Sequence, residues 1–188
     1  VYLLNNAIDL EKFAYNEKIR KSKRKELKID DETLVIGHIG RFVAQKNHTF
    51  LIDVFNELHK KEKNSALILA GQGPLMEEIK DKVNKLGLNT KSVKQVKFLG
   101  QRNDANELYQ AFDVFLLPSL YEGLGMVAVE AQCAGNYCIC STEVPSIVKM
   151  TENIEFLSLA DNADKWVERI LATTNKKRES HIKEIKDC

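Results

Sequence analysis

Two cations on one short loop are the first residues of this 188-residue sequence with the types and spacing to do chemistry. Arg41 and Lys46 follow Gly40, which comes directly after an apolar run. A guanidinium presents two parallel N–H groups to phosphate oxygens, and an ammonium adds a mobile point charge. The two side chains therefore suit a diphosphate whose negative charge grows as a bond to it breaks. Two solvated cations on a surface loop are the alternative interpretation.

Glycines and two carboxylates form a second such segment. Glu122 lies just before Gly123 and Gly125, and Glu130 follows with seven residues between the two carboxylates. Glycines let the backbone approach a ligand, and the free N–H groups of a helix starting at Met126 would bind an anion. At about 1.5 Å per residue, Glu130 stands roughly 7 Å along that helix, where it can accept hydrogen bonds from two ribose hydroxyls. Exposed glutamates without a ligand are the alternative.

A third segment, residues 71–74, reads Gly-Gln-Gly-Pro. Gly71 and Gly73 put flexible backbone beside the helix that Pro74 begins, where free N–H groups favour an anion or a close ligand. The spacing is not the GxGxxG pattern of dinucleotide-binding folds. A tight turn between a strand and a helix explains it at least as well.

The elements around these segments follow an alternating pattern. Short β-branched runs alternate with segments of helical period, which indicates a parallel sheet covered by helices. We expect strands at 33–39, 65–70, 93–99, 112–117, 137–141 and 154–159, and helices at 49–60, 74–86, 104–110, 126–134, 162–173 and 178–186. Asn47 is expected to cap the first of these helices. Ligands of open parallel sheets bind beyond the carboxyl ends of the strands, so the three segments should meet at one edge.

Composition excludes several classes of protein. Hydrophobic residues make up 44% and charged residues 29%, as in an ordinary globular domain, so disorder and coiled coil are excluded. With 28 Lys and Arg against 27 Asp and Glu, the net charge of +1 gives no general reason to bind nucleic acid. The apolar runs are shorter than the roughly 20 residues of a membrane-spanning helix, and no secretory signal follows Val1. These features predict a cytoplasmic location.

Cysteines and histidines give no metal-binding pattern. Three of the four cysteines lie within eight positions without the paired spacing of a zinc site, and we expect reduced core thiols at all four, Cys133, Cys138, Cys140 and Cys188. The histidines also lack ligand spacing, and we expect structural roles for them: His38, His48, His59 and His181. No Asp-x-Asp pair is placed beside a phosphate. We therefore predict a site that needs neither a metal nor a cofactor.

A basic segment precedes the first strand. Residues 17–28 carry seven basic and two acidic side chains, which would suit a helix facing nucleic acid or lipid. We interpret the segment instead as a solvated helix that leads into the strand.

Five motifs together resemble a known family. In order they are Gly40-Arg41 with Lys46-Asn47, then 70–74, 96–100 and 113–119, and finally Glu122-Gly-Leu-Gly125 with Glu130. Their order and spacing over about residues 6–148 resemble the retaining glycosyltransferases of family four. The resemblance implies the two-domain GT-B fold. The chain matches its C-terminal, donor-binding half, a Rossmann-like three-layer sandwich with a parallel sheet of about six strands.

The resemblance also implies roles for particular residues. In a nucleotide-sugar site of this kind, Arg41 and Lys46 would hold the diphosphate leaving group, Glu122 would contact hydroxyls of the donor sugar, and Glu130 would hold the ribose. Other residues implied in donor binding are Gly40, Gly71 and Gly73, then Phe98 and Leu99, where the backbone of about 96–100 would meet the base, and Gly123, Leu124, Gly125 and Met126 near the phosphate or sugar. The donor expected by frequency is a UDP-sugar.

Two departures from the family pattern shape the expected domain organisation. Residues 5–9 are a weak copy of the family's Pro-Asn-Gly-Ile-Asp junction, and we expect the N-terminal domain that receives the acceptor to be missing from these 188 residues. We therefore expect a linker remnant at 1–16 and a nucleotide-sugar-binding domain at 17–188, which alone would be inactive. The 141–145 loop resembles bacterial capsule and exopolysaccharide enzymes. A glycan or lipid-linked acceptor would bind through the missing domain, with peripheral association of the full enzyme at the inner face of the membrane.

Two alternatives stay open at this point. A sugar-nucleotide epimerase or hydrolase can share this architecture, because a fold does not determine a reaction. A non-catalytic nucleotide-binding module is the second, since half of the expected cleft is absent.

Overall fold

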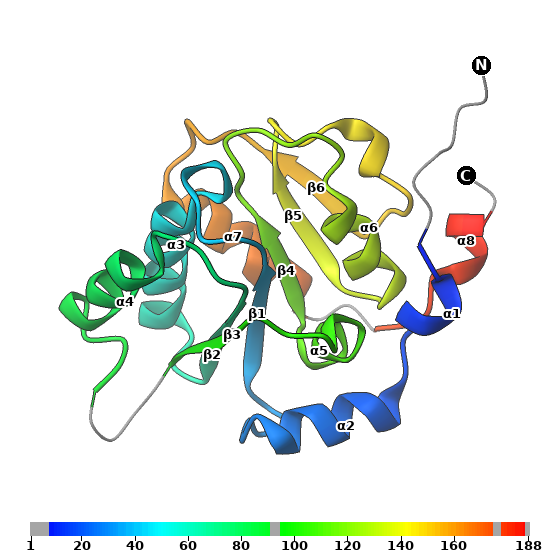
Figure 1. The fold of residues 1–188 in the computed structure, drawn as a ribbon, viewed down its shortest axis with the longest axis horizontal. Helices are drawn as coiled ribbons and strands as arrows, with labels where there is room; N and C mark the ends of the chain where they lie inside the picture. The colour runs from blue at the N-terminus through cyan, green and yellow to red at the C-terminus, as the bar shows by residue number, and fades with distance from the viewer. Residues whose placement is uncertain (1–7, 91–94, 175–177, 187–188) are drawn as a thin grey trace.

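A six-stranded parallel sheet forms the centre of the molecule (Figure 1). The computed structural model describes residues 8–90, 95–174 and 178–186. The strands stand in the order β3-β2-β1-β4-β5-β6, and every neighbouring pair is parallel. They are β1 (Leu34–Ile39), β2 (Ser65–Ala70), β3 (Val96–Gly100), β4 (Val114–Leu117), β5 (Tyr137–Ser141) and β6 (Ile154–Leu157). The strand order reverses between β1 and β4, which is where such sheets bind ligands.

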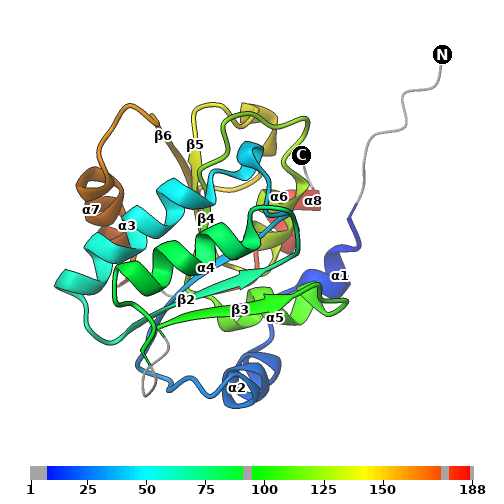
Figure 2. The same cartoon turned by 60° about the vertical axis from the view of Figure 1, so that its left-hand side comes forward.

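Helices cover both faces of the sheet, which confirms the three-layer α/β fold (Figures 1 and 2). One face carries α3 (His48–Lys61), α4 (Met76–Lys85) and α7 (Ala163–Thr173). The other carries α1 (Leu10–Phe13), α2 (Glu17–Glu26), α5 (Ala105–Ala111) and α6 (Met126–Cys133). The remaining helical segments are η1 (Ala44–Lys46), η2 (Ser146–Val148) and α8 (Ile182–Lys186). Each layer of helices encloses its own apolar core against the sheet.

The apolar strand sequences follow from burial on both faces. Ile68 of β2 packs into the core beside α5, whereas Leu67 and Leu69 pack into the core beside α3. A strand buried on both faces reads as a continuous apolar run, as 65–70 does. Gly37 is required in β1 because a Cβ there would lie 2.0 Å from the Phe112 ring.

Most predicted elements are confirmed, with differences at their ends. Strands β2 and β5 have the predicted bounds, whereas β4 begins at Val114 and β6 ends at Leu157. The predicted start of β3 at 93–94 lies outside the described residues. Asn47 occupies the N-cap position of α3, but in a left-handed conformation with φ of 51°. Its side chain makes no capping hydrogen bond, so that part of the prediction was wrong.

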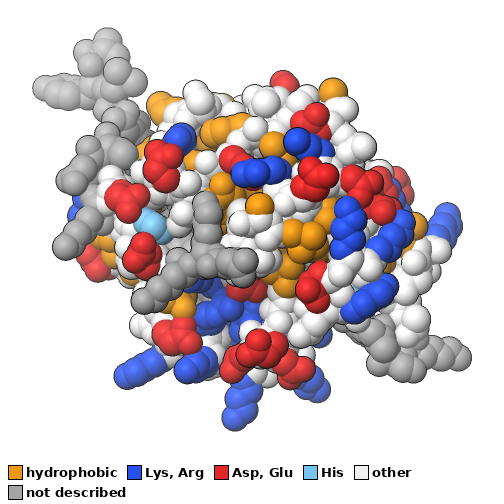
Figure 3. Space-filling view, turned by 180° about the vertical axis from the view of Figure 1, so that it is seen from behind, with side chains coloured by type: hydrophobic (Ala, Val, Ile, Leu, Met, Phe, Trp, Pro, Cys, Tyr) orange, Lys and Arg blue, Asp and Glu red, His pale blue; other side chains and the backbone are white. Residues whose placement is uncertain are grey.

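The helix predicted at 17–28 is present as α2, but the prediction that it is solvated was wrong for two of its basic side chains. Arg24 of α2 is only 1% exposed, and its five N–H groups donate to three loop carbonyls, the Ala111 carbonyl and the carboxylate of Asp113. Lys23 is buried too, and pairs with Glu26, Asp104 and Glu107. One side of α2 is therefore attached to the core through charged side chains. On the face of the molecule shown in Figure 3, acidic and basic side chains are mixed.

Residues before α2 also contact the sheet-covering helices. Ile8 and Phe13 pack against the apolar core, and the Cys133 thiol donates to the Leu10 carbonyl at 3.3 Å. Cys133, Cys138 and Cys140 are buried free thiols, as expected, while Cys188 lies outside the described residues. Within the described part of the chain, no helix combines the length and the apolar character that crossing a bilayer requires.

Candidate functional site

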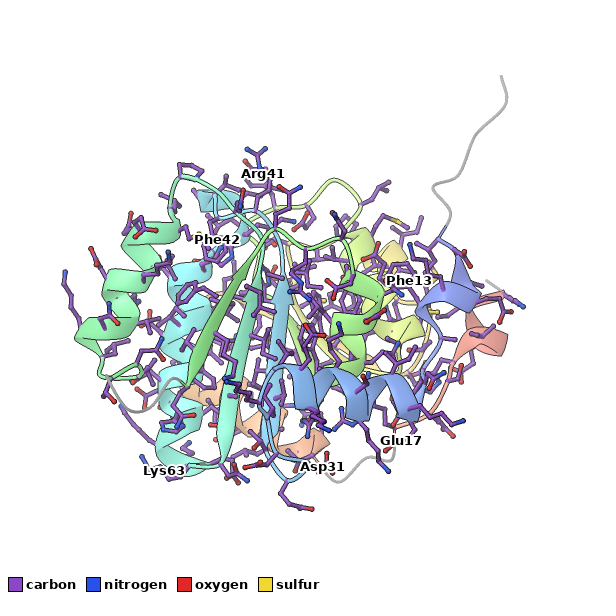
Figure 4. All side chains as sticks on the ribbon, turned by 60° about the horizontal axis from the view of Figure 1, so that its bottom comes forward. Phe13, Glu17, Asp31, Arg41, Phe42 and Lys63 are labelled. Carbon is purple, nitrogen blue, oxygen red and sulfur yellow. The ribbon has the colours of Figure 1, made fainter. Side chains whose placement is uncertain are left out.

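The loops that follow the strands meet beyond the carboxyl ends of the sheet, as predicted. A cavity of about 620 Å³ opens there and is lined by Gly40, Arg41, Gly71 and Gly73, with part of α5 on its other side. Figure 4 shows Arg41 at this edge, whereas Asp31 and Lys63 lie at the opposite edge, near the amino ends of β1 and β2. Four of the predicted site residues therefore share one cavity.

Arg41 projects from the loop after β1 (Figure 4). Its side chain is exposed and makes no hydrogen bond or ion pair with any residue that the structure describes. Surface guanidinium groups normally keep water as a partner, and a planar fork at the edge of a cavity suits an anionic ligand. The position fits a phosphate-binding role.

Lys46 and Glu122 form a direct ion pair between two loops. The Lys46 ammonium donates to Glu122 Oε1 at 2.5 Å, and the side chains are 15% and 6% exposed. The Leu120 N–H donates to the Gln45 carbonyl at 2.7 Å, so the backbones of the two loops are joined as well. The structure thus brings together a cation and a carboxylate that the sequence placed 76 positions apart.

Two uncharged residues complete this cluster and were missed by sequence reasoning. The Ser119 hydroxyl donates to Glu122 Oε1 at 2.6 Å, and the Gln45 amide donates to Glu122 Oε2 at 3.4 Å. Ser119 is itself held by the hydroxyl of Ser141, which donates to its carbonyl at 2.6 Å. Both residues could have been found from their positions in the sequence. Gln45 directly precedes Lys46, and Ser119 is the last residue of the 113–119 motif.

The two glycines after β2 have a packing role that the sequence left open. A Cβ on Gly71 would lie 2.0 Å from the Gly40 carbonyl oxygen, and one on Gly73 would lie 2.4 Å from the Phe42 carbonyl oxygen. The Phe42 N–H donates to the Gln72 carbonyl at 3.0 Å. Close contact between the loops after β1 and β2 thus explains both glycines, which also line the cavity.

Helix α6 begins at Met126, as the sequence predicted. Gly125 adopts a φ of 69° just before Met126, where a residue with a side chain would be strained. Gly123 is exposed with nothing within 4 Å of a Cβ position, so a ligand can approach its backbone. Leu124 between them is 44% exposed. The first N–H groups of α6 are thereby presented beside Glu122, whose Cγ lies 3.9 Å from the Cβ position of Gly125.

Glu130 lies in the middle of α6 and faces α5. It is partly buried, and Tyr109 donates its hydroxyl to Glu130 Oε2 at 2.8 Å. Burial raises the pKa of Glu130, while the hydrogen bond from Tyr109 acts in the opposite direction. A partly buried carboxylate held in place by a tyrosine is organised to accept hydrogen bonds from a ligand such as a sugar.

The side chains of Phe98 and Leu99 have packing roles. Their side chains pack into the two apolar cores, with the Phe98 ring 6.0 Å from that of Phe42. The Gly100 carbonyl at the end of β3 accepts a hydrogen bond from Gly71 N–H at 2.8 Å. Neither Phe98 nor Leu99 is among the residues that line the cavity, which on this side are Gln101 and Arg102.

Arg102, which sequence reasoning did not single out, lines the cavity beyond β3. Asp104 accepts two hydrogen bonds from its guanidinium at 2.7 and 2.6 Å, and Glu26 accepts a third at 3.0 Å. Its charge is already balanced by these carboxylates. Arg102 therefore offers the cavity an oriented planar group and not a free positive charge.

The histidines near the site are buried and neutral. His38 bonds the Leu116 carbonyl through Nδ1 at 2.8 Å, and the His48 ring stacks on Phe42 at 4.1 Å. Burial lowers the pKa of His38 to about 4 and that of His48 to about 2. Among the described residues, no group of three or more His, Cys, Asp or Glu side chains could hold a metal ion.

Comparison with protein families assigns the chain. The model of the family described as "Glycosyl transferases group 1" matches residues 19–186. The chain belongs to this glycosyltransferase family. Its fold is that of the C-terminal half of GT-B glycosyltransferases. The resemblance inferred from the five motifs is thus confirmed.

Curated relatives and solved structures agree with this assignment. EpsF of Bacillus subtilis (strain 168), which is named as a glycosyltransferase, is 38% identical over 98% of this chain and 48% of its own length. An Escherichia coli enzyme named UDP-Gal:alpha-D-GlcNAc-diphosphoundecaprenol alpha-1,3-galactosyltransferase is 29% identical over 94% of this chain and 46% of its own. The chain spans about half the length of the curated relatives that it matches.

Two solved structures show the same fold. Anabaena HepE, solved with UDP and glucose, superposes with a TM-score of 0.78 at 22% identity, over 91% of this chain and 46% of HepE. The C-terminal domain of the glycosyltransferase LpcC from Francisella tularensis superposes with a TM-score of 0.75 at 23% identity. That match covers 90% of this chain and 89% of the LpcC domain. The described residues therefore correspond to a unit that has been solved on its own in another glycosyltransferase.

Proposed function

We propose that this domain binds a nucleoside-diphosphate sugar, with UDP as the preferred nucleotide, and forms the donor half of a retaining glycosyltransferase. The observation that carries the proposal is the grouping of Arg41, the Lys46–Glu122 pair and the start of α6 around one edge of the sheet. HepE, which shares the fold, was solved with UDP and with UDP-glucose. The name of the Escherichia coli relative likewise includes a UDP-sugar.

The proposed division of roles follows from the contacts. Arg41 and the N–H groups at the start of α6 hold the diphosphate, and Lys46 donates hydrogen bonds to it from the neighbouring loop. Within the described part of the chain, Glu122 Oε1 accepts from Lys46 and Ser119, whereas Oε2 has only the 3.4 Å contact with Gln45. Oε2 is therefore the oxygen that would accept a hydrogen bond from a sugar hydroxyl. Glu130, held by Tyr109, would accept from the ribose.

Catalysis by these groups would be mainly electrostatic. The diphosphate gains negative charge as the bond to the sugar breaks, and preorganised donors stabilise it more than they stabilise the intact donor. Each such donor is worth about 2–4 kcal/mol in comparable sites. We propose that Arg41, Lys46 and the α6 terminus supply this stabilisation without a divalent cation. UDP affinity measured with excess EDTA and with excess Mg²⁺ should then be equal.

The acceptor and its pathway belong to the same proposal. EpsF and the Escherichia coli galactosyltransferase suggest a glycan or lipid-linked acceptor in bacterial polysaccharide synthesis. Such an acceptor would bind to a partner domain of about the size of this one, as in GT-B enzymes. The three buried free thiols suit a cytoplasmic location, with peripheral contact to the inner face of the membrane when the acceptor is lipid-linked.

Calorimetric titration of the domain with UDP, GDP and ADP tests the donor site directly. We expect saturable binding of at least one nucleotide and the tightest binding for UDP. Inorganic pyrophosphate serves as the matched ligand without base and ribose. Absence of binding for all three nucleotides would overturn the donor-site proposal, and tighter binding of GDP or ADP would overturn the preference for UDP.

A further inference from the structure

The ion pair between Lys46 and Glu122 changes the charge balance at the proposed diphosphate site. An ammonium alone would add one positive charge there, but the carboxylate 2.5 Å away cancels it. Lys46 has no second partner among the residues that the structure describes, so two of its three N–H groups are left for a ligand. Lys46 can thus donate to a phosphate while Glu122 keeps the pair neutral overall.

The pair is also placed to act on a bound diphosphate. The Lys46 stem contacts Gly40, since its Cγ lies 3.4 Å from the Cβ position of that cavity-lining glycine. The stem of Glu122 lies against Gly125, directly before the first N–H groups of α6. An anion at the helix terminus would therefore have the Glu122 carboxylate as a close neighbour of the same sign.

The cluster fixes Glu122 in this position. Both hydrogen bonds to Oε1 are short, from Lys46 at 2.5 Å and from Ser119 at 2.6 Å, and Ser119 is held in turn by Ser141. The carboxylate is 6% exposed, so water screens its charge poorly. The Glu122 carboxylate therefore cannot move away from a bound phosphate. It repels the ligand more strongly when the ligand carries more negative charge.

From this geometry we propose that Glu122 makes the site discriminate between the sugar-bearing donor and the free nucleoside diphosphate, and so favours release of the latter. The inference rests on the proposed donor-binding function. A donor sugar presents hydroxyls that donate to Glu122 Oε2 and offset the repulsion. A free nucleoside diphosphate lacks these hydroxyls, and its terminal phosphate carries a second ionisable proton with a pKa near 6. The free nucleoside diphosphate therefore carries more negative charge beside the Glu122 carboxylate, and it has no sugar hydroxyls whose hydrogen bonds would offset the repulsion.

The substitution Glu122→Gln tests this inference, because it removes the charge and keeps the shape of the side chain. Calorimetry should show UDP binding about tenfold more tightly to the variant, the effect of one partly screened charge–charge interaction. UDP-glucose should bind no more tightly than to the native domain. Glu168→Gln is the matched control, since it makes the same charge change at an exposed position of α7 and should leave both affinities unchanged.

Unchanged UDP affinity in Glu122→Gln, or equal tightening for UDP and UDP-glucose, would overturn the inference while leaving the donor site intact. Absence of binding of either ligand to the native domain would instead overturn the proposed function itself. Lys46→Met provides a second test if Glu122→Gln folds poorly. It leaves the carboxylate without its partner, so the loss of affinity should be several-fold larger for UDP than for UDP-glucose, and equal losses would contradict the inference.

Discussion

Arg41 at the carboxyl edge of the sheet and the arginines at its amino edge are used in opposite ways. At the amino edge, Arg20, Arg24 and Arg178 converge on the carbonyls of 109–112 and on the Asp113 carboxylate. Arg24 and Arg178 use all five of their N–H groups within the protein. At the carboxyl edge, Arg41 has no partner among the described residues. Fully partnered guanidinium groups hold elements together, whereas an unpartnered one beside a cavity is available to a ligand.

The difference extends to the cavities at the two edges. A second cavity of about 310 Å³ lies at the amino edge, where Asp31, Glu32, Glu62 and Asp113 are among the lining residues. Its acidic lining would repel a nucleotide diphosphate. Burial lowers the pKa of Arg178 in this cavity to about 9, so the group stays charged near neutral pH and bound to backbone carbonyls. We therefore expect substitutions at this edge to change stability and substitutions at the other edge to change binding.

The largest effect should come from Arg24→Ala. The change removes the donor to four backbone carbonyls and one of the two arginines that pair with the Asp113 carboxylate, and breaking a buried ion pair in this way costs about 3–5 kcal/mol. The free energy of unfolding from urea denaturation measures it. Lys25→Ala, at an exposed position of the same helix, is the control and should change stability by about 0.5 kcal/mol or less. A similarly small change for Arg24→Ala would show that the buried cluster is not stabilising.

Arg41→Ala should show the reverse pattern. Stability should change by about 0.5 kcal/mol or less because the side chain has no internal partner, while UDP affinity should fall about 30-fold with the loss of a charge-assisted contact. Arg41→Lys should recover part of that affinity, since it restores the charge without the planar fork. Native-like UDP binding by Arg41→Ala would remove the distinction between the two edges.

Glu130→Ala should produce a selective and smaller loss. If Glu130 accepts hydrogen bonds from the ribose, UDP affinity falls about tenfold and the affinity for inorganic pyrophosphate is unchanged. Competition calorimetry with both ligands measures the two effects together. Equal losses for UDP and pyrophosphate would assign Glu130 to the phosphates or to the structure of α6.

The smallest expected effect is a pH-dependent change of stability at Glu130. Burial raises the folded-state pKa of this carboxyl above its ordinary value of 4.5, so the native protein holds the proton at pH values where the unfolded chain has lost it. Stability contributed by this group therefore decreases as pH rises through that window. Glu130→Gln should be more stable than the native domain at pH 7, and the difference should disappear at pH 4. A difference that does not depend on pH would contradict the raised pKa.

The fold could be predicted from the sequence because the central strands β2, β4 and β5 are buried on both faces. Apart from a serine at one end of each, the runs 65–70 and 137–141 are apolar and are bounded by glycine or polar residues, so their bounds could be read directly. The α2 segment was misinterpreted because its charges suggested solvent. Only the folded chain shows that the carbonyls at the end of α5 and the Asp113 carboxylate accept hydrogen bonds from Arg20 and Arg24.

The sequence predicted at which edge of the sheet the candidate site lies, but it did not predict the contacts between the residues of the site. The rule that ligands bind beyond the carboxyl ends of parallel strands located Arg41, Glu122 and the start of α6. The pairing of Lys46 with Glu122 depends on how two distant loops meet, and no local pattern encodes it. The same holds for Gly71 and Gly73, whose close contacts with Gly40 and Phe42 arise only in three dimensions.

The structure of this domain with bound UDP tests the donor-site account most directly. The account predicts the diphosphate within hydrogen-bond distance of the Arg41 guanidinium and the first N–H groups of α6, with the ribose hydroxyls donating to Glu130. UDP bound at the amino edge of the sheet, or with its ribose away from Glu130 and its phosphates away from Arg41, would contradict it.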